Sequence, residues 1–240
     1  MKTTMINQLK LAAMAAMLPL ALSSAHGGGV SINFNLSDLN TYGSSSEAIG
    51  DYYNGGTDAG GATGPNYGIS FGSDALALRN YPNSNVGNEP DGGYASMIFL
   101  SGSGDIMNVA AGFTTGFSFY YAAPFYTGSV SVYSGLNGTG TLLATLALPL
   151  TPDGKSSPYN LPYNYGVWDP IGVTFAGTAE SVSFSGTANY ITFADLTIGS
   201  EIPSLNNNVP DNGGMSIYML AGLGLAGMAW ASRKKVAATV

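Results

Sequence analysis

Short runs in which apolar and polar residues alternate recur through the middle of the chain, between clusters of Gly, Asn, Pro and Asp. A period of two is typical of β-strands that bury one face, and no long helical period is present there. This spacing predicts an all-β sandwich. The predicted strands are Val30–Leu36, Tyr94–Leu100, Phe113–Tyr121, Ser129–Tyr133, Thr141–Leu148, Val167–Phe175, Ser181–Phe184 and Tyr190–Ile198.

The alternation also assigns the side chains that face the core. Asn137-Gly138 lies between two predicted strands and is a hairpin signal, because both residues tolerate positive φ. The stretch Asp38–Tyr67 is expected to be a long irregular excursion. The predicted core residues are Phe113, Phe117, Phe119, Val130, Val132, Val167, Ile171, Val173, Phe175, Val182 and Phe184.

The last predicted strand changes phase. Ile191 and Phe193 share one face, whereas Leu196 and Ile198 fall on the other. We therefore expect a β-bulge at Ala194-Asp195, unless Asp195 points inward.

The first 25 residues read as a secretory signal peptide, with two lysines, an apolar run at Leu11–Leu22 and small residues after it. Ser23 and Ala25 suit signal peptidase and place the cut before His26, although Ala21 and Ser23 offer a second site. The alternative, an uncleaved anchor, needs a longer apolar run.

Residues 215–232 contain no charge, and these 18 residues form about 27 Å of helix, enough to cross a bilayer core. Arg233, Lys234 and Lys235 follow at once and place the tail 233–240 in the cytoplasm. The alternative is a buried C-terminal helix.

A polar linker at 204–214 precedes this segment and contains Val209, Pro210, Asp211, Gly213 and Gly214. Together with the span and the basic cluster, these residues resemble the C-terminal signal of PEP-CTERM proteins, in a Val-Pro-Asp variant. The resemblance implies that exosortase processes an inner-membrane-anchored precursor, which then reaches the cell surface or the extracellular space. It also implies an association with exopolysaccharide.

The segment Tyr190–Ile198 resembles the closing strand of jelly-roll ectodomains found in PEP-CTERM proteins and carbohydrate-binding modules. The resemblance implies that residues 26–203 form a jelly-roll-like ectodomain in which Asp195 helps to hold a structural calcium ion. Asp38, near the first predicted strand, is a candidate second ligand. A bulge or turn-capping aspartate is the alternative. Calcium requires several oxygen ligands. Further candidates are Asn83, Asn85, Glu89 and Asp91.

The net charge of the middle of the chain limits the classes of partner that it can bind. Between His26 and Val209 there are thirteen acids and only two cations, Arg79 and Lys155, which gives a net charge of −11. Such a surface does not favour nucleic acid or anionic lipid head groups. Cysteine is absent, so disulfides, thiolate nucleophiles and zinc–cysteine sites are excluded.

No catalytic residue is predicted, and we expect a protein that is not an enzyme. Gly68–Gly72 matches the nucleophile-elbow pattern, but that pattern needs a following helix and a later histidine. The single histidine is His26, upstream of the match. A hydrolase that uses two carboxylates stays open on composition alone.

Aromatic residues point to a ligand. Fourteen of the fifteen tyrosines lie between His26 and Val209. Tyr163, Tyr165 and Trp168 lie in a loop rich in Asn, where rings can stack on sugars. Tyrosine is also simply a favoured strand residue. We expect a non-enzymatic surface or matrix protein; the alternatives are a glycan-binding module and, third, a glycan-active hydrolase.

Overall fold

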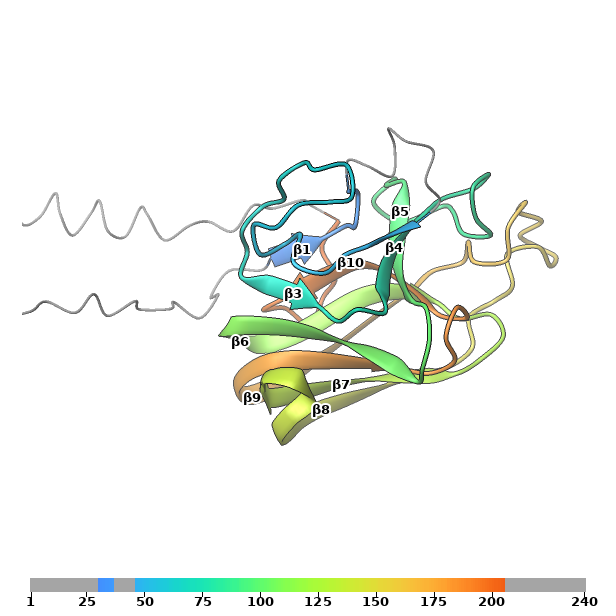
Figure 1. Ribbon diagram of the computed structural model, residues 1–240. Coiled ribbons are helices and arrows are strands. Elements are labelled where there is room, and N and C mark those ends of the chain that lie inside the picture. Colours follow the sequence, from blue (N-terminus) through green and yellow to red (C-terminus); the bar gives the residue numbers. More distant parts are fainter. Residues whose placement is uncertain (1–29, 37–45, 206–240) are drawn as a thin grey trace, which may run out of the picture.

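The structure is a computed structural model that describes residues 30–36 and 46–205. Antiparallel strands fold into a sandwich, with a single turn of 3-10 helix in the described part (Figure 1). The predicted all-β class is confirmed. The strands are β1 (Val30–Ile32), β2 (Ser46–Ala48), β3 (Ile69–Phe71), β4 (Ala75–Arg79), β5 (Ala95–Phe99), β6 (Gly104–Ala122), β7 (Gly128–Gly135), β8 (Thr139–Leu148), β9 (Asp169–Ser185) and β10 (Thr192–Ile198).

The long strand β6 organises the sheet. One edge pairs with β9 along most of its length, and the other edge pairs with β3 near Val109 and with β10 near Ala122. The free edge of β10 then takes both β5 and β1. The last described strand therefore lies beside the first, and the order of the main path is β2-β4-β5-β10-β6-β9-β7-β8.

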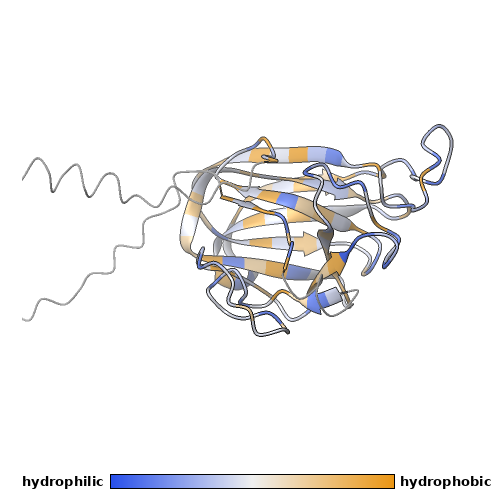
Figure 2. Cartoon of the chain, turned by 90° about the horizontal axis from the view of Figure 1, so that it is seen from above, coloured by the Kyte–Doolittle hydropathy of each residue, from blue (hydrophilic) through white to orange (hydrophobic). Residues whose placement is uncertain are grey.

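The core lies between the layers, and most of the predicted inward residues are fully buried there. Figure 2 shows hydrophobic positions alternating with polar ones along the strands, as a period of two requires. β5 and β10 are buried at every position. The confirmed core residues are Phe113, Phe117, Phe119, Val130, Val132, Val182 and Phe184.

The remaining four are only half-buried. Ile171, Val173 and Phe175 lie in the first half of β9 and pack against the core from its margin, which confirms their predicted face. Val167 precedes β9, so its prediction as an inward strand residue was wrong. The physical reason for the partial burial is the sheet edge: β7 pairs with β9 only at residues 181–185. Among the described strands, the outer edge of 169–175 has no ladder partner, so its side chains keep contact with solvent.

Boundaries also differ from the sequence pattern. The predicted strands 167–175 and 181–184 form one strand, β9, whereas β2, β3 and β4 were not predicted. The hairpin turn is confirmed, with φ of 58° at Asn137 and 69° at Gly138. Three-residue strands such as β2 and β3 leave too short an alternation to recognise in a sequence.

The phase slip in β10 is a bulge, as predicted. Its register against β6 shifts between Ala194 and Thr197, and Asp195 adopts a positive φ of 51°. Asp195 is also only 2% exposed. The predicted bulge is therefore confirmed, and Asp195 is buried there beside Asp91 of the β4–β5 loop.

The targeting segments lie outside the described residues. These are the signal peptide with Ser23, Ala25 and His26, and the sorting signal, span and basic tail at 209–240. Within residues 30–36 and 46–205, no helix has the length and apolar character needed to cross a bilayer.

Candidate functional site

Three places in the sandwich bring polar or aromatic groups together. The first, here called the acidic cluster, consists of Glu89, Asp91, Asp195 and Asn80. The loop between β4 and β5 folds back so that Asn80 Nδ2 donates to a Glu89 carboxylate oxygen and, at 2.9 Å, to the carbonyl oxygen of Gly93. The backbone N–H of Gly93 in turn donates to Asp91 Oδ1 at 2.6 Å. The bulge in β10 directs Asp195 toward Asp91.

Burial dominates the electrostatics of this cluster. Burial, with a smaller contribution from the nearby carboxylates of Asp91 and Glu89, raises the pKa of Asp195 to about 8. Burial likewise raises the pKa of Glu89 to about 7, against a lowering hydrogen bond from Asn80. Asp195 Oδ2, Glu89 Oε1 and Asn80 Oδ1 are buried and have no hydrogen-bond partner among the described residues.

These orphaned oxygens test whether the residues fit calcium. Calcium takes oxygen ligands from carboxylates, amides and carbonyls, and the cluster offers only such donors. The described residues do not, however, gather three or more acidic, histidine or cysteine side chains in a metal-binding arrangement. The donor type therefore fits, with no more than two acids at one point.

The other calcium candidates lie elsewhere. Asp38 falls outside the described residues. Asn85 is bonded across to the loop after β8, where its Nδ2 donates to Asn164 Oδ1 at 2.6 Å. Asn83 is exposed at a turn closed by its N–H to the carbonyl of Asn80. Of the six candidates named from the sequence, Asp195 and Asp91 lie side by side, and Glu89 is near enough to raise the pKa of Asp195.

The predicted glycan residues hold two loops together. Trp168 Nε1 donates to the Gly87 carbonyl oxygen at 3.0 Å. Tyr165 is 6% exposed and packs in a small satellite core with Val86 and Ala122. Tyr163 is half-buried, with its ring centroid 5.8 Å from that of Tyr81. Of these three, Tyr165 is buried, and Tyr163 and Trp168 are half-buried.

A second place, the aromatic end, consists of Phe125, Tyr126 and Tyr190. These side chains are 44%, 46% and 40% exposed and lie on the turns after β6 and before β10. Their rings meet edge to face, with 4.7 Å between the Tyr126 and Tyr190 centroids and 6.4 Å between Phe125 and Tyr190. The sequence analysis missed this cluster; Phe125-Tyr126 immediately after a predicted strand was its only local signal.

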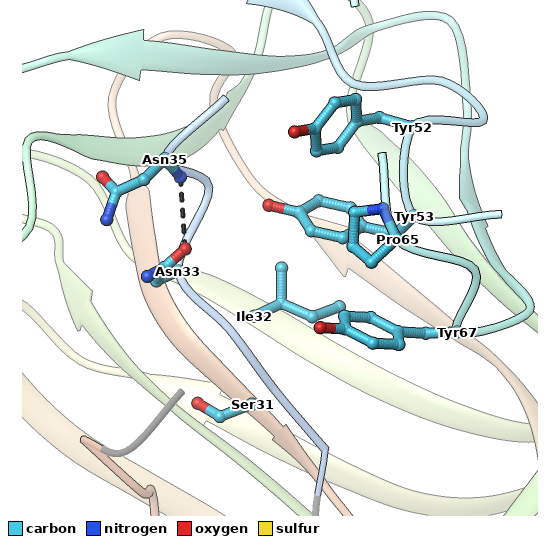
Figure 3. A pocket seen from close by; sticks show the side chains of 8 residues that line it. All are labelled: Ser31, Ile32, Asn33, Asn35, Tyr52, Tyr53, Pro65 and Tyr67. Atoms are coloured by element: carbon cyan, nitrogen blue, oxygen red, sulfur yellow. Dashed lines mark hydrogen bonds between the residues drawn. The ribbon is translucent and has the colours of Figure 1, made fainter. Parts of the chain in front are cut away.

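The third place, the tyrosine pocket, is a cavity of about 320 Å³. Figure 3 shows three tyrosines projecting from one wall, with their hydroxyl ends toward the strand that carries Asn33. Tyr53 is buried, whereas Tyr52 and Tyr67 are half-buried. The lining residues are Ser31, Ile32, Asn33, Asn35, Tyr52, Tyr53, Pro65 and Tyr67.

The nucleophile-elbow match does not form an elbow. Ser70 lies inside strand β3, paired with Asn108 of β6. A short turn and strand β4 follow it, where the elbow requires a helix.

No protein-family model matches the sequence, and no curated protein matches it. Among solved structures, the K2 cleaved adhesin domain of Lys-gingipain is 15% identical, with a TM-score of 0.41 over 71% of this chain and 99% of that one. CsCBM6-3 from Clostridium stercorarium, in complex with cellobiose, is 12% identical, with a TM-score of 0.36 over 55% and 86%. A β-1,3-glucan-binding module from Bacillus halodurans is 17% identical, with a TM-score of 0.33 over 56% and 87%.

Proposed function

We propose that residues 30–205 form the extracellular, non-enzymatic, glycan-binding part of an exported protein. The aromatic end is the observation that carries this proposal. Large aromatic side chains that stay 40% or more exposed in one cluster are typical of binding surfaces rather than of a domain core. Tyrosine suits a sugar because its ring stacks on the apolar face of a pyranose while its hydroxyl bonds to solvent or ligand.

The position of the aromatic end would keep its rings accessible to a ligand on a domain that is tethered at its termini. Thr192 of β10 pairs with Ala122 beside the aromatic end, whereas Ile198 pairs with Val30 at the other end of the same strand. Ser31 Oγ also donates to the Ser204 carbonyl oxygen at 3.0 Å. Both ends of the described domain therefore lie together, away from the aromatic rings, which leaves those rings accessible on a tethered domain.

The proposal includes the processing route and a jelly-roll-like topology. Signal peptidase removes residues 1–25, and exosortase reads the signal from Val209 to Lys235 before the domain joins the surface or the exopolysaccharide matrix. The return of the last strand beside the first supports the jelly-roll assignment. Intact mass of the protein from its native host tests the route; retention of Met215–Val240 would contradict it.

We also propose that the acidic cluster holds a structural calcium ion through Asp91, Asp195 and neighbouring oxygens. Three buried oxygens without partners support this role, because leaving such atoms unpaired is unfavourable. The ion would offset the mutual repulsion of the carboxylates and fix the β4–β5 loop against β10.

A glycan array tests the binding function. The full chain, purified in detergent, is applied with and without calcium, next to the Tyr126→Ala/Tyr190→Ala double variant. We expect retention of extended neutral polysaccharides that the double variant loses. A blank array for a folded protein would instead favour a purely structural matrix component.

A further inference from the structure

We infer that the tyrosine pocket is a second ligand site, separate from the aromatic end, that takes one or two rings of a neutral saccharide. The proposal does not depend on the aromatic end. It rests on the composition of the pocket, the pre-formed walls and the charges that surround it.

One wall is formed by Ser31 and Ile32 of β1 and by the irregular segment 33–36 that follows the strand. Phe34 adopts a positive φ of 60° and is buried, as is Leu36. The polar residues Ser31, Asn33 and Asn35 line the pocket. The backbone N–H of Tyr94 donates to Asn35 Oδ1 at 3.0 Å, and that of Asn35 to Asn33 Oδ1 at 3.3 Å, which fixes this segment.

The other wall is an ordered two-stranded excursion. Tyr67 N–H donates to the Tyr53 carbonyl oxygen at 2.8 Å, and isolated bridges pair Asn54 with Asn66 and Thr57 with Thr63. Gly64 allows the walls to approach: a Cβ there would lie 2.1 Å from the Tyr52 carbonyl oxygen and 2.8 Å from its ring. A pre-formed wall of this kind reduces the ordering that a ligand must impose.

Tyr53 is structural, whereas its neighbours are available. The Tyr53 ring lies nearly parallel to Tyr67 at 6.2 Å and packs edge to face against Tyr52 at 5.2 Å. Its hydroxyl is hydrogen-bonded to the backbone of Phe34. Within the described ranges, no hydrogen bond is recorded for the hydroxyls of Tyr52 and Tyr67, which face the strand across the cavity in Figure 3.

The chemistry of the lining selects the ligand. No lining residue is charged, so the pocket offers ring faces, hydroxyls and amides to a neutral polyhydroxylated molecule. An anionic sugar would be repelled by the net charge of −11 that residues 26–209 carry, and the lining contains no cation to offset this repulsion. A volume of about 320 Å³ lies at the lower end of small-ligand pockets, which suits one or two sugar rings.

Ligand-detected NMR on the full chain in detergent tests the inference, with a panel of neutral methyl pyranosides and disaccharides and the matching uronic acids as probes. We expect at least one neutral probe to bind, its uronic acid to bind at least tenfold more weakly, and Tyr67→Ala to reduce binding at least tenfold. Tyr67→Phe keeps the ring and should retain most of the binding. Tyr159→Ala, at an exposed tyrosine outside both sites, is the matched control and should leave it unchanged.

Thermal unfolding of each variant separates lost binding from lost folding. If Tyr67→Ala unfolds, Tyr67→Phe together with Tyr52→Ala decides the matter. The inference is overturned if no neutral probe binds, if uronic acids bind equally well, or if folded Tyr52→Ala and Tyr67→Ala bind normally. If the Tyr126→Ala/Tyr190→Ala variant loses array retention but binds pyranosides normally, only the aromatic end has failed. If a pocket variant loses pyranoside binding but keeps array retention, only the tyrosine pocket has failed.

Discussion

The aromatic end and the tyrosine pocket use the same residue type in opposite ways. At the aromatic end, Tyr126 and Tyr190 stand on short turns, remain 46% and 40% exposed, and meet only each other and Phe125. In the pocket, Tyr52 and Tyr67 are half-buried, packed on a structural tyrosine and opposed by an amide-bearing strand. An open cluster can contact an extended polymer at many positions, whereas a concave site selects a short unit. Composition alone cannot separate the two.

The largest effect on this comparison is expected from Gly64→Ala. The new Cβ would overlap the Tyr52 carbonyl oxygen and ring, so the excursion must shift and the pocket must lose its shape. Binding of neutral pyranosides should fall by about tenfold or more, on the order of 1.4 kcal/mol. Titration calorimetry measures this loss, and retention of polysaccharide by the aromatic end should persist.

Thr63→Ala is the matched control, since Thr63 is the exposed residue next to Gly64. Equal losses in both variants would mean that the whole excursion is sensitive to change and that the pocket shape is not the cause.

The next effect concerns the acidic cluster. In chelator, stability should fall as pH rises from about 4 to about 8, because the unfolded Asp195 carboxyl ionises near 3.8 while the folded one keeps its proton to about 8. Glu89, with a pKa of about 7, adds to the same slope. Calcium should reverse the loss, with a rise in Tm of about 4 °C or more at pH 9 and much less at pH 5.

Asp195→Asn should flatten the pH slope in chelator and remove most of the calcium response, as differential scanning calorimetry can measure. Glu201→Gln is the control, because Glu201 is exposed and lies outside the acidic cluster. A calcium response that survives Asp195→Asn unchanged would place the ion elsewhere.

A smaller effect is expected when Tyr126 alone is replaced by Ala. Retention on a polysaccharide column should fall about threefold to fivefold, and the free energy of unfolding should change by only about 0.5 kcal/mol because the side chain is largely exposed. Tyr159→Ala is matched in exposure, at 44%, and lies outside the cluster. Equal losses in the two variants would argue for diffuse contact and against a defined aromatic end.

The smallest effect is expected from Tyr52→Phe, which removes one hydroxyl and keeps the ring. Pyranoside binding should weaken by about fivefold, in line with about 1 kcal/mol for one hydrogen bond. Calorimetry against the wild type measures it, with Tyr126→Phe as the control. A loss as large as that of Tyr52→Ala would show that the hydroxyl, and not the ring, makes the main contact.

Local pattern determined much of this protein from sequence. The alternation of Phe117 and Phe119 and the Asn137-Gly138 pair depend on residues a few positions apart, so strand type, core face and hairpin turn could be predicted. The phase slip at Asp195 was visible for the same reason. The predicted signal peptide, span and sorting signal also stand on local pattern and remain predictions.

Tertiary structure decided which residues meet. Asp195 and Asp91 are 104 positions apart, and only the placement of β10 beside β5 brings them together. Tyr165 and Trp168 looked available in sequence, yet the loop containing them packs on residues near Gly87, which takes their groups out of solvent. Ser31 and Tyr67 meet across the pocket because a long excursion folds back over β1. A sequence determines which face of a strand is polar, but the ligand that this face meets depends on contacts between distant segments.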